Sequence, residues 1–170
     1  MSKINIFKMY HNGQGKLMNN TNAPSFKTAM KEMNSNQGKQ GHWSWYIMPT
    51  NKGSRQFNNK FKLTPTDAVV FLSDPLLREN YVHFMLKVSK RLDDGMDPQT
   101  LLMSNVDVRK TFDSATFFKR ISKKTNDMVV YAVTNAVVDR LNPYMRKLNK
   151  QKIARQPMSA LFTQLKSRKV

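Results

Sequence analysis

The stretch Gly41-His42-Trp43-Ser44-Trp45-Tyr46-Ile47-Met48-Pro49 contains both tryptophans of the chain. Tryptophan is large, and its indole N–H needs a hydrogen-bond partner when the ring is buried. In an extended run, alternation would place the two tryptophans on one face and His42, Ser44 and Tyr46 on the other. The stretch therefore predicts either an anchor around which helices pack or the aromatic wall of a pocket with His42 beside it.

Helix starts recur on both sides of this stretch, whereas paired strands do not. Before it, apolar residues repeat at helical spacing from Pro24 onward. After it, short motifs combine a capping side chain with a proline in the first helical turn, namely Thr64-Pro65-Thr66-Asp67, Ser73-Asp74-Pro75 and Asp97-Pro98. The second motif begins the longest apolar stripe, which Gly95 ends and which consists of Leu77, Tyr81, Phe84, Val88 and Leu92.

Two more helices are expected in the second half of the chain, capped by Asn105 and by Thr125. Asn142-Pro143 is expected to end the second, because the residue before a proline disfavours helical backbone. The chain is therefore predicted to be all-α, a compact multi-helix single domain with basic N- and C-terminal extensions. The predicted divisions are a basic segment and loop at 1–23, a helical domain at 24–141 and a basic extension at 142–170.

The charge of the chain is extreme and uneven. Its formal net charge is +18, from 29 Lys and Arg residues against 11 Asp and Glu residues. From Met1 to Lys62, Glu32 is the only acid against ten bases, and from Leu141 to Val170 eight bases stand without an acid. A solvated face normally mixes both signs, so the C-terminal run indicates contact with phosphates or an acidic protein surface. The predicted polyanion-binding residues are Arg146, Lys147, Lys150, Lys152, Arg155, Lys166, Arg168 and Lys169.

The sequence gives no support for several classes of site. It has no cysteine, and its three histidines lack metal-ligand spacing, so we expect neither a disulfide nor a metal. No cofactor motif or nucleophile–base set is recognisable, so no cofactor is expected and no catalytic residue is assigned. The N-terminus lacks the apolar core of a signal peptide, and no run is long enough to span a membrane. We expect an intracellular protein, or one packaged in a virion.

The aromatic stretch also carries a family resemblance. His42-Trp43-Ser44-Trp45-Tyr46-Ile47-Met48-Pro49 resembles the His-Trp-x-Trp signature of the uncharacterised domain family numbered eighteen-ten, whose members are often labelled calpastatin. Leu72-Ser73-Asp74-Pro75-Leu76-Leu77 and the segment 105–118 are similar to later segments of that family, in the same order. The resemblance covers roughly residues 24 to 140 and implies a compact, mainly helical domain. It implies no activity, and Thr50 and Asp74 replace a Gln and a His of the family pattern.

If the two family-like segments pack together, polar residues of segment 105–118 approach the aromatic stretch. They would form a polar pocket with an aromatic wall, suited to a nucleotide-like or sugar-like ligand. The alternative is a structural network in which these side chains satisfy one another and their own helix. The candidate pocket residues are His42, Trp43, Trp45, Asp107, Lys110, Ser114 and Thr116.

Two functions are consistent with these patterns. The first is a non-enzymatic structural or packaging protein that binds nucleic acid or acidic protein surfaces within a large assembly, such as a virion or a ribonucleoprotein particle. The second is a protein or enzyme that holds a small nucleotide-like ligand in the Trp-lined pocket. An apolar stripe among the C-terminal bases also allows peripheral contact with a membrane surface, through Met158, Leu161, Phe162 and Leu165.

Overall fold

The computed structural model describes residues 1–52 and 59–154. Within these ranges the chain forms helices and no strand, and one isolated bridge pairs Lys16 with Asn22. This confirms the all-α prediction. The helices are α1 (Lys3–His11), α2 (Phe26–Asn34), α3 (Ser44–Ile47), α5 (Pro65–Ser73), α6 (Pro75–Asp93), α7 (Pro98–Leu102), α8 (Asn105–Thr125) and α9 (Met128–Ala154).

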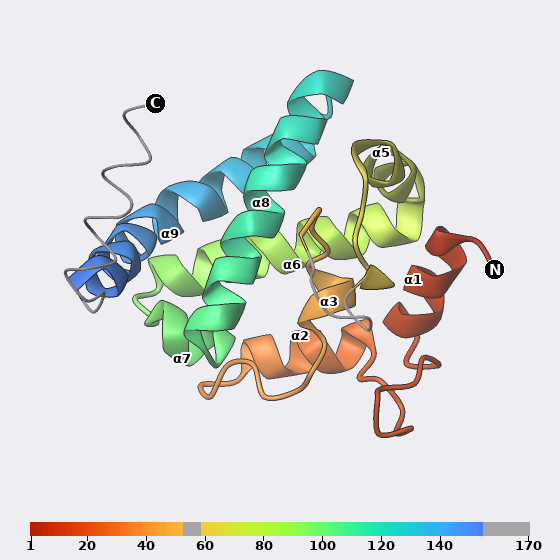
Figure 1. The fold of residues 1–170 in the computed structure, drawn as a ribbon, viewed down its shortest axis with the longest axis horizontal. Coiled ribbons are helices and arrows are strands. Elements are labelled where there is room, and N and C mark those ends of the chain that lie inside the picture. The colour runs from red at the N-terminus through yellow and green to blue at the C-terminus, as the bar shows by residue number, and fades with distance from the viewer. Residues whose placement is uncertain (53–58, 155–170) are drawn as a thin grey trace, which may run out of the picture.

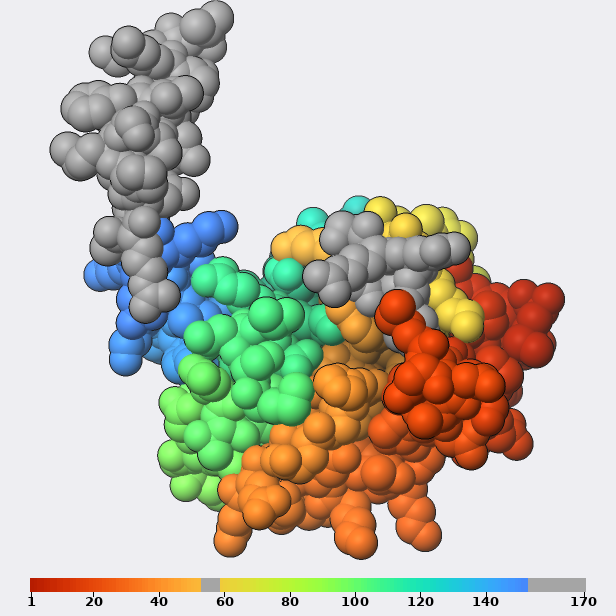
Figure 2. Space-filling model, turned by 60° about the horizontal axis from the view of Figure 1, so that its bottom comes forward, coloured from red at the N-terminus to blue at the C-terminus, as the bar shows by residue number. Residues whose placement is uncertain are grey.

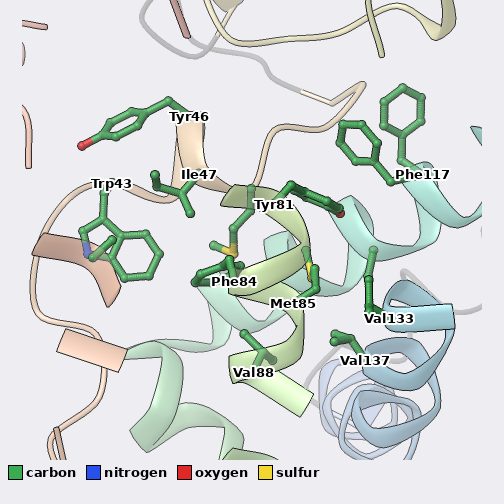
Figure 3. Close-up of a cluster of buried hydrophobic side chains, with 14 of the residues drawn as sticks. Trp43, Tyr46, Ile47, Tyr81, Phe84, Met85, Val88, Phe117, Val133 and Val137 are labelled. Carbon is green, nitrogen blue, oxygen red and sulfur yellow. The ribbon is translucent and has the colours of Figure 1, made fainter. Parts of the chain in front are cut away.

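Helix α6 lies in the middle of the fold (Figure 1) and contacts α1, α2, α3, α5, α7 and α9. Helix α8 packs along α9 and also reaches α3, α5 and α7. The core between them is aromatic and aliphatic, with side chains from α3, α6, α8 and α9 meeting around Tyr81, Phe84 and Met85 (Figure 3). The ring centroids of Tyr81 and Phe118 are 4.4 Å apart, and those of Trp43 and Phe84 are 5.5 Å apart. One continuous core therefore joins the two halves of the chain.

The predicted helix starts are largely confirmed. Thr64 and Asp67 form a capping box at α5, and Asp74 and Asp97 cap α6 and α7 through their side chains. The cap of α8 is Ser104, one residue before the predicted Asn105.

The predicted cap of the last helix is wrong. Thr125 is the last residue of α8, and Asn126 leaves the helix with a left-handed φ of 59°. The N–H of Val130 instead donates to Asp127 Oδ1 at 3.1 Å, so Asp127 caps α9. A carboxylate is a stronger acceptor than a hydroxyl at the positive end of a helix, which favours this choice.

The extended conformation considered for the tryptophan stretch is also wrong. Residues Ser44–Ile47 form a single helical turn, α3. Residues two apart in a helix point about 200° apart rather than to one face. Trp43 is accordingly buried in the core, whereas Trp45 is only half-buried.

Pro143 does not end α9, contrary to the prediction. The helix continues through it to Ala154, although proline lacks the N–H that the carbonyl of Asp139 would accept. Met145 and Leu148, which follow the proline, are buried in the core. Their packing offsets the lost hydrogen bond.

The N-terminal segment contributes to the same core. Phe7 and Tyr10 of α1 are fully buried, and the Phe7 ring lies 5.1 Å from that of Phe71 and 5.6 Å from that of Phe61. Lys3 and Lys8 pair with the capping carboxylates of α5 and α6. Helix α1 is thus part of the core, and α9 continues past residue 142.

None of the helices in the described part of the chain has the length and apolarity needed to cross a membrane. The apolar stripe predicted at residues 158–165 lies outside the described residues.

Candidate functional site

The first turns of α8 present a row of buried polar side chains to α3. Asp107, Thr111 and Ser114 stand at the three- and four-residue spacing that puts them on one face of the helix. Ser44 Oγ donates to Asp107 Oδ1 at 2.6 Å, and Ser114 Oγ donates to the carbonyl of Pro49 at 2.8 Å. This row therefore holds the tryptophan stretch against α8.

Two lysines approach the buried carboxylate of Asp107. Lys39 Nζ lies 3.1 Å from Asp107 Oδ2 with its side chain only 1% exposed, and it also donates to the carbonyl of Gly41 at 2.6 Å. Lys110 Nζ lies 3.8 Å from Asp107 Oδ1. Two ammonium groups thus share one carboxylate, and the cluster carries an excess positive charge when both are protonated.

Lys110 also lies over the indole of Trp45. Its Nζ is 3.0 Å from the ring centroid, an arrangement in which the ring quadrupole attracts a cation. Burial lowers the pKa of Lys110 to about 7, the attraction of Asp107 opposes this shift, and the charge of Lys39 adds to it. Near neutral pH the amine therefore exchanges between its charged and neutral forms.

Glu32 of α2 fixes the segment that leads into α3. Its Oε2 accepts from the indole Nε1 of Trp43 at 2.6 Å and from the backbone N–H groups of Gln40 and Gly41 at 2.8 Å each. The sole acid among the first 62 residues thus serves as the partner of the buried tryptophan. Trp43 is a structural anchor, one of the two roles that the sequence left open.

A cleft of about 630 Å³ lies beside Trp45 and the first turns of α8. Four cationic side chains and one carboxylate contribute to its lining. Lys52 pairs with Asp113 at 2.6 Å, and Arg109 Nη1 donates to Asn149 Oδ1 of α9 at 3.0 Å. The lining residues are Trp45, Thr50, Asn51, Lys52, Lys62, Val106, Arg109, Lys110 and Asp113.

The structure brings three of the predicted pocket residues together. Trp45 and Lys110 line the cleft, and Asp107 contacts Lys110 from behind. The cleft thus combines one aromatic ring with several cationic side chains.

The other predicted pocket residues lie elsewhere. His42 is exposed and does not line the cleft. Trp43 is enclosed in the core, and Ser114 bonds Pro49 and the hydroxyl of Tyr81. Thr116 is half-buried, with no hydrogen-bond partner for its Oγ1 among the described residues.

Sequence reasoning missed several contributors to this region. Lys39 gives no local signal, because its partner Asp107 is distant in sequence and only the fold joins them. Lys52 and Arg109 contribute to the positive charge of the cleft. They were missed because a single basic residue on a loop or helix surface is common and does not indicate a site. Ser44 stands between the two tryptophans, and this polar residue in an aromatic stretch is a sequence signal for its buried hydrogen bond to Asp107.

A second positive region lies at the end of α9. Arg146, Lys147, Lys150 and Lys152 are all exposed. All 11 acidic residues fall in the described ranges, yet none of the ion pairs there involves these four side chains. We refer to the four as the α9 basic surface. The other predicted polyanion-binding residues lie outside the described residues, namely Arg155, Lys166, Arg168 and Lys169.

The described residues contain no cluster of three or more side chains suited to hold a metal ion.

Comparison with curated proteins and with solved structures finds no match. A family model described as "Protein of unknown function (DUF1810)" matches residues 14–152. That span includes the tryptophan stretch, the cleft and the α9 basic surface, and it extends the resemblance of residues 24 to 140 at both ends. The chain therefore belongs to the DUF1810 family.

Proposed function

We propose that the protein is a non-enzymatic component that binds nucleic acid through the α9 basic surface, within a larger assembly such as a virion or a ribonucleoprotein particle. The observation that carries the proposal is the contrast along α9. Arg140 is held by Asp93 at 2.6 Å, whereas the four bases of the α9 basic surface are exposed and form no ion pair within residues 1–52 and 59–154. Unpaired, exposed cations on one helix end are free to contact phosphates.

The spacing of these bases supports contact with a backbone rather than with base edges. Arg146, Lys147 and Lys150 fall on one side of the helix, because residues three and four apart are neighbours on its surface. Three phosphate contacts on this side would give a salt slope of about −2.7 on duplex DNA, and a fourth contact from Lys152 would bring it to about −3.6, at roughly −0.9 for each contact. The sequence has no zinc finger or RNA-recognition signature, so binding is expected to be independent of base sequence.

The cleft supports a second candidate function, the binding of a small nucleotide-like ligand. Its volume of about 630 Å³ falls in the range of small-molecule sites. Trp45 supplies a planar surface, and Lys52, Lys62 and Arg109 supply positive charge. Titration of the protein with a panel of mononucleotides, followed by calorimetry, tests this candidate directly.

The main proposal is tested by fluorescence anisotropy with a labelled oligonucleotide. The test variant replaces the four bases of the α9 basic surface with glutamine. The matched control replaces four other exposed lysines, which lie on α2 and α8 and have the same total charge, namely Lys27, Lys31, Lys123 and Lys124. We expect the test variant to lose at least tenfold in affinity and the control to lose much less. An equal loss in both variants would refute a localised surface and leave only general attraction to a basic protein. Retained binding of an acidic peptide with no binding of nucleic acid would assign the surface to a protein partner instead.

A further inference from the structure

We infer that the nucleic acid is single-stranded and that an unpaired base enters the cleft beside Trp45 while the adjoining phosphates follow the α9 basic surface. This inference rests on the proposed function. It assigns the cleft and the basic surface to a single extended ligand.

The first argument is that the two positive regions are continuous. Arg109 lines the cleft, and its guanidinium donates to Asn149 of α9 at 3.0 Å. Asn149 lies three residues from Arg146 and three from Lys152, so it is a neighbour of each of them on the helix surface. Figure 2 agrees with this, since the green beginning of α8 lies between the blue α9 and the orange segments of the N-terminal half. A single strand that leaves the cleft past Arg109 would therefore meet Arg146 and Lys152 next.

The second argument concerns the chemistry of the cleft. Proteins that bind single strands combine a cationic groove with aromatic rings on which bases stack. Trp45 is half-buried, and Lys110 Nζ covers one face of its ring at 3.0 Å from the centroid, so a base would stack on the opposite face. Lys52, which pairs with Asp113, and Lys62 also line the cleft, and their ammonium groups can donate to phosphate oxygens. Asn51 and Thr50 add neutral polar groups at the same site.

The third argument separates single strands from duplexes. A base inside a duplex reaches a recessed aromatic ring only after it is unstacked and unpaired, which costs a few kcal/mol. An unpaired base avoids that cost. A duplex would contact the α9 basic surface through its phosphates but would not reach Trp45. A single strand would contact both the basic surface and Trp45.

The experiment compares a labelled oligothymidylate with a hairpin duplex that carries the same number of phosphates, at one salt concentration. The variants are Trp45→Leu, which removes the stacking surface, and Trp45→Phe, which retains one. The control is Val70→Ser, because Val70 is 49% exposed on α5, lies outside the cleft and has no aromatic ring. We expect the single strand to bind the native protein at least tenfold more tightly. Trp45→Leu should weaken single-strand binding by between about 5-fold and 150-fold, the effect of losing one stacked base. Duplex binding should not change.

Two further measurements keep the test decisive if Trp45→Leu does not fold. Arg109→Gln should weaken the single strand more than the duplex, because it breaks the junction between the cleft and α9. Oligothymidylate should also quench the emission of Trp45 in the native protein, since Trp43 is fully buried and does not meet the ligand.

The outcomes distinguish a failure of this inference from a failure of the proposed function. Equal affinity for both nucleic acids, with no effect of Trp45→Leu or Arg109→Gln, would overturn this inference and leave the proposed function intact. Absence of binding to either nucleic acid would overturn both. Binding of thymidine monophosphate as tightly as the oligomer would overturn the inference in favour of a small ligand.

Discussion

Replacement of Asp107 by asparagine is the sharpest test of how the buried cluster holds the fold. The change keeps the shape of the side chain and an oxygen that accepts from Ser44, but it removes the charge opposite Lys39 and Lys110. At the 3.1 Å that separates Lys39 Nζ from Asp107 Oδ2, an effective dielectric constant of about 20 gives an attraction of about 5 kcal/mol. Because Lys39 is 1% exposed, water does not replace the lost partner.

We therefore expect Asp107→Asn to lower the free energy of unfolding by about 3–5 kcal/mol, the usual cost of breaking a buried pair. The assay is urea unfolding at neutral pH, followed by circular dichroism. The matched control is Asp113→Asn, the same substitution on the same helix. Its partner Lys52 is 67% exposed, so the control should cost less than about 1 kcal/mol.

A double variant separates the lost pair from the stranded charge. The double variant Lys39→Met, Asp107→Asn removes both charges of the closest pair. It should be considerably more stable than Asp107→Asn alone, because the buried ammonium of Lys39 no longer lacks a partner. A loss for Asp107→Asn as small as that for Asp113→Asn would refute the reasoning. It would mean that the cluster is solvated or rearranges freely.

Three other perturbations follow from the same structure. Burial lowers the pKa of Lys110 from its ordinary 10.5 to about 7, so between these pH values the unfolded chain binds more protons at Lys110 than the native chain does. Stability should therefore rise with pH in this range, and Lys110→Met should abolish that part of the rise in urea titrations at several pH values. Burial lowers the pKa of His11 to about 4, while its Nε2–H donates to the carbonyl of Tyr46. The unfolded state therefore gains a proton near pH 6.5 and the native state does not, so stability should fall by roughly 3 kcal/mol between pH 6.5 and 4, and His11→Gln should show a smaller fall. Pro143→Ala restores an N–H for the carbonyl of Asp139 and should raise the free energy of unfolding by about 1–3 kcal/mol, and an unchanged urea midpoint would contradict this.

Local chemistry explains which parts of the fold could be predicted. The starts at Thr64, Asp74 and Asp97 are defined by a side chain that caps its own helix three residues on, and such a signal lies entirely within the sequence. The end of α9 depends instead on the burial of residues after Pro143 by distant helices. No local pattern contains that information, so the proline was taken as a stop.

The same division applies to the site. The family resemblance placed Asp107 and Lys110 near the tryptophan stretch. In the structure Lys110 lies over the ring of Trp45, and Asp107 pairs with Lys110. His42 was assigned to the pocket because it stands beside the tryptophans in the sequence, but its side chain is exposed and does not line the cleft. Lys39 was missed because its role arises only from a contact across the fold.

The central claim is that the α9 basic surface, rather than the charge of the protein as a whole, holds the nucleic acid. The most direct measurement is the slope of log affinity against log salt concentration on one duplex, for the native protein and for the variant with glutamine at residues 146, 147, 150 and 152. The account predicts that the variant's slope is shallower by about 3.6, which corresponds to four lost phosphate contacts. Identical slopes would show that these side chains touch no phosphate.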